Sequence, residues 1–315
     1  MGYLALWEVF ESKQRSDIEG LPDRALYFME KIRVFSQLHS VHGAIYKPGR
    51  TFLDSLPFIY EKGGYFVWML ESVMGEDRFQ RAIRSYLNKY QFGTVDHEQL
   101  WASLDEENPF DGISMSTVFN TWLMQEGYPY LTVSRCYTEK CKNQVTFKQR
   151  RYRYNNKLQS ELKELWYIPI SYAIITYDND TITTTDVKNS FVMQTQELVH
   201  DLGSAPLDSN FAIIVNVNNT GMYLVGYDER NWKAIGTVLM KNPHVIPPAT
   251  RMQLVTLLKN GLARKEIHES LFLCIGEYLK VRLDNKYLLD DIFLILESIV
   301  DLCITLLLIT NLDYS

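Results

Sequence analysis

Apolar residues recur with helical spacing along the first part of the chain. Between Phe79 and Tyr90 they stand at i, i+4, i+7, i+8 and i+11, which traces one face of a helix. Asp96, with Gln99 three residues later, forms a capping box that predicts the start of another helix. These patterns predict a helical segment over residues 1–128.

The pattern then changes to short runs rich in β-branched and aromatic residues. We expect strands at Tyr130–Ser134, Gln144–Lys148, Trp166–Tyr177, Thr181–Thr185, Phe191–Gln194, Phe211–Val217 and Met222–Tyr227. The tetrapeptide Asn218–Gly221 is predicted to form a hairpin turn between the last two. Several short strands at this spacing are typical of a β-sandwich, here over residues 129–229.

Helical spacing returns from Asn231 onward. The predicted helices are Ala249–Leu262, Lys265–Val281 and Leu288–Leu308, within a third segment over residues 230–315. The fold class is therefore α+β, and the chain is multidomain.

The overall charge limits the classes of partner. The chain has 315 residues, of which 46% are hydrophobic and 22% charged, and a formal net charge of -6. A protein with this balance lacks the broad basic face that nucleic-acid phosphates require. We therefore expect no nucleic-acid partner, and we interpret the one basic run, Lys148–Arg153, as a solvated strand.

The cysteines bear on the cellular compartment. Cys136 and Cys141 stand between two predicted strands, where a disulfide would staple a hairpin and indicate an oxidising environment. Asn179–Thr181 and Asn218–Thr220 are N-glycosylation sequons, a pattern that also arises by chance. The sequence after Met1 does not read as a signal peptide.

One segment carries a family resemblance. Residues Tyr60–Leu70 read Tyr-Glu-Lys-Gly-Gly-Tyr-Phe-Val-Trp-Met-Leu, a tyrosine ahead of Lys-Gly and an apolar helix. This segment resembles the transition-state tyrosine motif of the gluzincin zinc aminopeptidases, the aminopeptidase N-like family. Further landmarks follow in the family's order: Gly75–Phe79, Tyr86-Leu87, Leu100-Trp101, Trp122–Pro129, Trp166–Ile170, Asn216–Trp232 and Ile246–Leu254. The similarity spans about residues 35 to 290, and the ordered set is more specific than any single motif.

The resemblance implies an assignment for each segment. Residues 1–128 would be the helical C-terminal part of a thermolysin-like catalytic domain, without its zinc helix. Residues 129–229 would be the family's β-sandwich, and residues 230–315 the truncated start of its α-helical, solenoid-like domain. The residues after Leu289 resemble nothing in the family.

The resemblance also implies a chemistry. Members hold zinc with the two histidines of an H-E-x-x-H helix and a distant glutamate, and they remove N-terminal residues from peptides. By this resemblance Tyr60 is the catalytic residue that donates a hydrogen bond to the developing oxyanion. No H-E-x-x-H stands anywhere in the sequence. We therefore expect that this chain binds no zinc and is inactive alone.

Three other segments offer possible metal ligands, but none of them completes a site. His97 begins an H-E-x-x pattern, but Trp101 occupies the position where the second histidine is needed. His39 and His42 are three residues apart, yet they fall in a segment that resembles a family loop. Glu8 lies in a faint likeness of the distal glutamate motif, and its spacing to the tyrosine motif is short.

Two hypotheses follow. The first is a fragment of a zinc aminopeptidase, and the alternative is a non-catalytic, aminopeptidase-like binding or scaffold protein. The family, the cysteine pair and the sequons favour a plasma-membrane or extracellular location, with a cytoplasmic one as the alternative. Membrane attachment would require segments outside this chain.

Without the zinc helix, we expect the apolar face around Trp68, Trp101 and Trp122 to be exposed and the chain to be poorly soluble.

Overall fold

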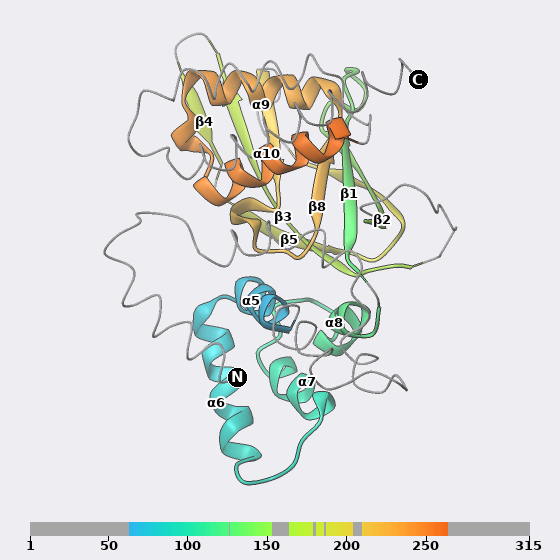
Figure 1. The fold of residues 1–315 in the computed structure, drawn as a ribbon, viewed down its shortest axis with the longest axis vertical. Coiled ribbons are helices and arrows are strands. Elements are labelled where there is room, and N and C mark those ends of the chain that lie inside the picture. Colours follow the sequence, from blue (N-terminus) through green and yellow to red (C-terminus); the bar gives the residue numbers. More distant parts are fainter. Residues whose placement is uncertain are drawn as a thin grey trace, which may run out of the picture.

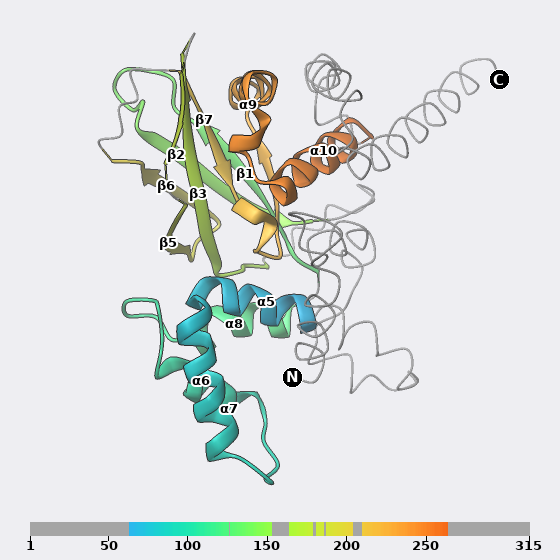
Figure 2. The ribbon, with the colours of Figure 1, turned by 90° about the vertical axis from the view of Figure 1, so that its left-hand side faces the viewer.

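The computed structural model describes residues 63–263, except 126, 153–163, 179–180, 186 and 204–209. A helical group, α5–α8, lies at one end of a two-sheet β-sandwich, and α9 and α10 cover one side of the sandwich (Figures 1 and 2). Along the described part of the chain, α5–α8 precede the eight strands, and α9 and α10 follow them. Every predicted element before residue 63 or after residue 263 lies outside it.

The helical group consists of α5 (Gly63–Met74), α6 (Glu76–Lys89), α7 (His97–Asp105) and α8 (Met115–Met124). The predicted capping box is present, because the Asp96 side chain accepts from the main chain of α7 and Gln99 accepts from the Asp96 amide. Phe66 packs edge-on against Trp101 and Phe119, with ring centroids 6.0 and 5.5 Å away. Apolar burial of this kind holds short helices together.

The sandwich is built from two sheets. Its strands are β1 (Pro129–Arg135), β2 (Gln144–Arg151), β3 (Ile168–Tyr177), β4 (Ile182–Thr184), β5 (Lys188–Met193), β6 (Glu197–Asp201), β7 (Asn210–Val215) and β8 (Leu224–Tyr227). One sheet has the order β6-β2-β1-β8, and in the other β3 pairs with β4, β5 and β7. Most of β3 is buried, which places it at the centre of the core.

The connection between β7 and β8 differs from the predicted hairpin. β7 pairs antiparallel with β3, whereas β8 pairs in parallel with β1 in the opposite sheet. The segment Asn218–Gly221 therefore lies in a crossover between sheets that contains the 3-10 turn η2 (Val217–Asn219). Turn-forming residues predict where the chain reverses, but they do not specify which strands then pair.

Helices α9 (Glu229–Lys241) and α10 (Pro248–Ala263) follow β8, with the 3-10 turn η3 (Pro243–Val245) between them. Asp228 caps α9 by accepting from the Asn231 amide. The Asn231 side chain donates to the Ile213 carbonyl and accepts from its amide, both at 3.0 Å. One buried side chain thus satisfies two main-chain groups on the edge of β7.

The predicted disulfide is present between Cys136 and Cys141, with the two Cα atoms 5.6 Å apart. It closes the loop that joins β1 to β2. The other two cysteines lie outside the described residues. Among the described residues, no helix combines the length and the apolar character needed to cross a bilayer.

The expected exposure of three tryptophans is wrong for two of them. Trp101 and Trp122 are buried, and only Trp68 is half-buried. Trp122 donates its indole N–H to the Tyr167 carbonyl at 2.8 Å, so this side of α8 packs on the sandwich. The helical pattern of α8 does not show that the segment around Tyr167 covers Trp122, because the two are 45 positions apart.

Candidate functional site

The candidate catalytic tyrosine, Tyr60, lies outside the described residues. The structure does describe the helix α5 (Gly63–Met74), which contains the later part of the same motif. The described part of the motif, from Gly63 to Leu70, lies in this helix. Its buried face carries Tyr65, Phe66, Met69 and Leu70.

Tyr65 connects this helix to the sandwich. Its ring is 5% exposed, and its hydroxyl donates a hydrogen bond to the main-chain carbonyl of Asn219, which lies 154 positions later in the sequence. Burial raises the pKa of the Tyr65 hydroxyl well above its ordinary value, and the nearby Tyr223 raises it further. Tyr65 is therefore a neutral hydrogen-bond donor at neutral pH.

The turn that receives this hydrogen bond has an uncommon backbone conformation and is held by internal hydrogen bonds. Asn216, Asn218 and Asn219 have φ angles of 59°, 61° and 53°, the left-handed region that non-glycine residues seldom occupy. The buried Asn216 side chain accepts from the Gly221 amide at 2.8 Å, and donates to the carbonyls of Gly221 and Tyr223, each at 2.9 Å. Asparagine tolerates this backbone region better than most residues.

Helix α10 contacts the other side of the same turn. Gln253 donates to the Asn219 side-chain oxygen at 2.7 Å, and the Asn218 amide donates to the Thr250 hydroxyl at 2.8 Å. Gln253, Thr250 and Asn219 are all essentially inaccessible to solvent. Helices from the first and third segments thus meet through one turn of the sandwich.

A cavity of about 340 Å³ lies beside this junction. Its wall comes from α5, the loop before α8, the strands β3 and β5, and the turn after η2. Asp111 is the one ionisable side chain in its lining apart from the buried Tyr223. The lining has no set of carboxylates and histidines suited to a divalent metal.

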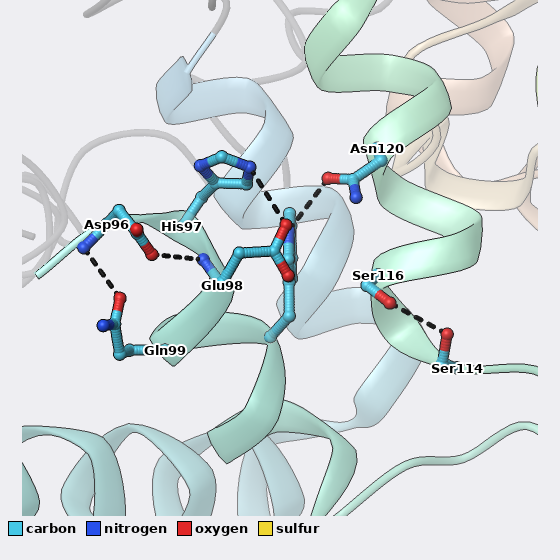
Figure 3. Close-up of polar contacts among 8 residues, drawn as sticks. Asp96, His97, Glu98, Gln99, Ser114, Ser116 and Asn120 are labelled. Atoms are coloured by element: carbon cyan, nitrogen blue, oxygen red, sulfur yellow. Dashed lines mark hydrogen bonds and ion pairs between the residues drawn. The ribbon is translucent and has the colours of Figure 1, made fainter.

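Within the described ranges, His97 belongs to no group of side chains placed to hold a metal ion. It starts α7 and lies 3.3 Å from the carboxylate of its neighbour Glu98 (Figure 3). One helical turn further on, Trp101 is buried and donates to Asn120 of α8 at 2.9 Å. The position of a second ligand is thus filled by an apolar ring that belongs to the core.

The described part of the chain contains no group of three or more histidine, cysteine, aspartate or glutamate side chains placed to hold a metal ion. The family's zinc therefore has no fitting site among these residues. Three further candidate ligands lie outside the described residues: Glu8, His39 and His42.

Sequence reasoning missed the Tyr65–Asn219 contact. Tyr65 reads as one more apolar position of a helix, and Asn219 as one more turn residue. No local pattern links positions 154 apart. The one available signal was the cluster of asparagines with a following glycine, which indicates left-handed backbone.

Known proteins resemble this chain over part of its length. The Peptidase family M1 domain matches residues 44–122. Aminopeptidase N of Rattus norvegicus is 29% identical over 205 residues, which are 62% of this chain and 19% of that protein. Aminopeptidase N of Oryctolagus cuniculus is 31% identical over 201 residues, or 62% of this chain and 20% of that protein. Probable aminopeptidase 1 of Saccharolobus solfataricus is 32% identical over 175 residues, or 55% of this chain and 19% of that protein.

These matches span about a fifth of the length of the relatives. The family domain covers the tyrosine motif and continues to Trp122 at the end of α8. The matched relatives are named as aminopeptidases from a mammal and from an archaeon, so the similarity is not confined to one narrow group.

Proposed function

We propose, from the premise that this chain is a partial, aminopeptidase N-like member of peptidase family M1, that it is a piece of a zinc aminopeptidase. The intact protein would remove N-terminal residues from peptides. The single observation that carries this proposal is the family match over residues 44–122, because it includes the tyrosine motif in its family context.

In this proposal Tyr60 stabilises charge during peptide hydrolysis. Attack on a peptide carbonyl turns its oxygen into an oxyanion, and a hydroxyl donor aimed at that oxygen favours the transition state over the ground state. Tyr60 stands two residues ahead of Lys62-Gly63, as in the family motif. The well-packed helix α5 that follows supports this assignment, because a donor must be held in place to act.

The chain alone is proposed to be inactive. The whole sequence lacks the H-E-x-x-H pattern, and among the described residues no alternative metal cluster exists. The missing ligands and the general base would come from a segment of the intact protein that this sequence does not include. The domain boundaries 1–128, 129–229 and 230–315 are proposed on the same basis.

The lack of an H-E-x-x-H pattern favours a second candidate function. A polypeptide without metal ligands but with a well-packed sandwich would serve as a binding or scaffold protein rather than an enzyme. Peptides would then be bound without being cleaved. The Cys136–Cys141 disulfide supports an oxidising compartment for either function, and we propose a plasma-membrane or extracellular location.

The test compares variants of the intact product on a leucine arylamide. We expect Tyr60→Phe to lower kcat by about 10²–10³-fold with little change in KM, as for loss of one oxyanion donor. The matched control is Tyr86→Phe, which removes a hydroxyl from a half-buried tyrosine on α6 and should leave kcat unchanged. Wild-type kcat in the Tyr60→Phe enzyme would refute the assigned role.

If the intact product shows no zinc-dependent turnover with any N-terminal residue, the scaffold hypothesis is favoured. Binding of unlabelled peptides to the 315-residue chain, measured by calorimetry, would then be the informative experiment.

A further inference from the structure

We propose that a second cavity, between the sandwich and α9, binds a tetrahedral oxyanion with Arg135 and Arg230 as its main ligands. The anion is a sulfate or phosphate group, either a free ion or a group carried by a sugar. None of the lining residues belongs to the tyrosine motif, so the proposal does not depend on the peptidase assignment.

The cavity has a volume of about 350 Å³, which is within the range of small-molecule sites. It lies where β1 and β3 end and β7 begins, and α9 forms another part of its wall. A hollow with a local excess of positive charge attracts anions even where the protein as a whole is acidic. Four basic side chains and one acidic side chain line this cavity: Arg135, Lys142, Arg230, Lys233 and Glu139.

The two lysines of the lining are already paired. The Lys142 ammonium lies 3.3 Å from the Glu139 carboxylate, and the Lys233 ammonium lies 2.6 Å from the carboxylate of Glu229. The Arg230 guanidinium, in contrast, has no hydrogen bond or ion pair with any described residue. The donors left for an anion are therefore mainly those of the arginines.

One aromatic ring orients both arginines. The Cζ atoms of Arg230 and Arg135 lie 3.9 and 4.9 Å from the centroid of the Tyr137 ring. The Tyr137 hydroxyl donates to the Asp228 carboxylate, which also accepts from the Arg135 amide and caps α9. Asp228 is not part of the lining. The ring is thus fixed in place, and it holds two guanidinium groups by cation–π contacts.

The loop that carries Tyr137 is also held. The disulfide between Cys136 and Cys141 closes it, and Cys136 itself lines the cavity. A site whose side chains are already in place loses less conformational entropy when its ligand binds. The disulfide and the Tyr137 hydrogen bond therefore favour binding.

Arg135 has donors that the protein does not use. One of its terminal nitrogens donates to the Phe211 carbonyl, whereas its Nε is buried and has no partner among the described residues. Burial lowers the pKa of the Arg135 guanidinium, and the charge of Arg230 acts in the same direction. Two like charges with unused donors disfavour each other, and an anion that contacts both relieves this repulsion.

A tetrahedral oxyanion suits these groups. A guanidinium presents its N–H donors as a fork that matches the oxygens of sulfate and phosphate. The cavity is larger than such an ion, which leaves room for a sugar that carries it. The rings of Tyr177 and Phe211 in the wall offer apolar surface to that sugar.

Calorimetric titration of the 315-residue chain with sodium sulfate, at an ionic strength held constant with sodium chloride, tests the site. We expect saturable binding that Arg230→Gln weakens by about 10-fold or more, as for loss of hydrogen bonds to a charged group. Glu139→Gln should tighten binding by about 2-fold or more, because it removes the acidic lining group and releases Lys142. The matched control Arg84→Gln removes the same charge from the exposed face of α6 and should leave the affinity unchanged.

A sulfated disaccharide derived from heparin, titrated in the same way, distinguishes the two sources of the anion. Binding about 10-fold tighter than that of sulfate, with the same loss in Arg230→Gln, would assign the site to an anionic sugar. Equal affinity would assign it to the free ion. No saturable binding of either probe, or equal losses in Arg230→Gln and Arg84→Gln, would overturn the proposal.

Discussion

The side chain of Gln149 forms two hydrogen bonds with the main chain of Trp166, accepting from its amide at 3.0 Å and donating to its carbonyl at 2.8 Å. Gln149 lies on β2 and Trp166 leads into β3, so this pair joins the two sheets. Gln149 is 1% exposed, and it also donates to the Thr195 carbonyl at 2.9 Å. One buried amide thus satisfies three main-chain groups.

Replacing this amide should be severely destabilising. We expect Gln149→Leu to lower the free energy of unfolding by at least about 3 kcal/mol, because buried main-chain groups left without partners each cost about 1–3 kcal/mol. Urea unfolding followed by fluorescence would measure it. The control Gln80→Leu, on the exposed face of α6, should change stability by less than about 0.5 kcal/mol. Equal losses in the two variants would refute the importance of the pair.

Removing the disulfide should have a moderate effect. The Cys136–Cys141 bridge closes a loop with a sequence separation of 5. The chain-entropy relation gives about 2 kcal/mol for so short a loop. The variant with both cysteines changed to serine should therefore melt a few degrees lower, and reductant should lower the melting temperature of the wild type but not of the variant. A reductant effect on the variant would contradict this explanation.

Gly226 is required by close packing rather than by its backbone angle. A Cβ atom at this position would overlap the ring and hydroxyl of Tyr130, which lies on the neighbouring strand β1. We expect Gly226→Ala to cost about 1–3 kcal/mol, the usual penalty for overpacking a core. Gly63→Ala is the control, because a Cβ there meets nothing within 4 Å and alanine favours helix. Adding Tyr130→Leu to Gly226→Ala should recover part of the loss, and no recovery would refute the steric explanation.

The protein should lose stability in alkali. Burial raises the pKa values of Tyr65, Tyr223 and Tyr227 above their value in an unfolded chain. Their contribution is fully present below about pH 10, the ordinary tyrosine pKa, and is lost as the pH rises toward the folded-state pKa values. Each tyrosine adds about 1.4 kcal/mol per pH unit to the slope of this loss.

Absorbance at 295 nm and circular dichroism across pH 9–12.5 would test this expectation. Ionisation of the buried tyrosines should coincide with unfolding, and Tyr65→Phe should make the loss of stability less steep. Tyrosine ionisation that is complete before any unfolding would contradict the assigned burial.

Local sequence patterns predicted most of the described elements. The β-branched runs correctly placed β1 to β4, and the capping box at Asp96 and the disulfide were also found. These features depend on residues close together in the chain. The strand β6 was missed, because Glu197–Asp201 is a short edge strand in which only two of the five residues are apolar.

Features that depend on distant residues could not be predicted. The parallel pairing of β8 with β1 joins strands about 90 positions apart, and a hairpin signal between β7 and β8 pointed to the wrong partner. The burial of Trp122 depends on Tyr167, and the Tyr65–Asn219 contact spans 154 positions. In each case the contact is decided by how whole segments pack, and no periodicity in one segment reports on another.

The candidate site also combines features that local sequence predicts with features that depend on distant residues. The tyrosine motif was recognised from adjacent residues, and the family match over residues 44–122 includes it. The contacts of α5 with the sandwich, Tyr65 with Asn219 and Met69 with Met222, join residues about 150 positions apart, and no local pattern indicates them.

The most direct test of the account is the zinc content and arylamidase activity of the purified 315-residue chain after incubation with zinc and dialysis. We predict less than about 0.1 zinc per chain and no turnover that a chelator abolishes, because the sequence has no H-E-x-x-H and residues 63–263, where described, hold no group of three potential ligands. One zinc per chain together with chelator-sensitive hydrolysis of a leucine arylamide would contradict it.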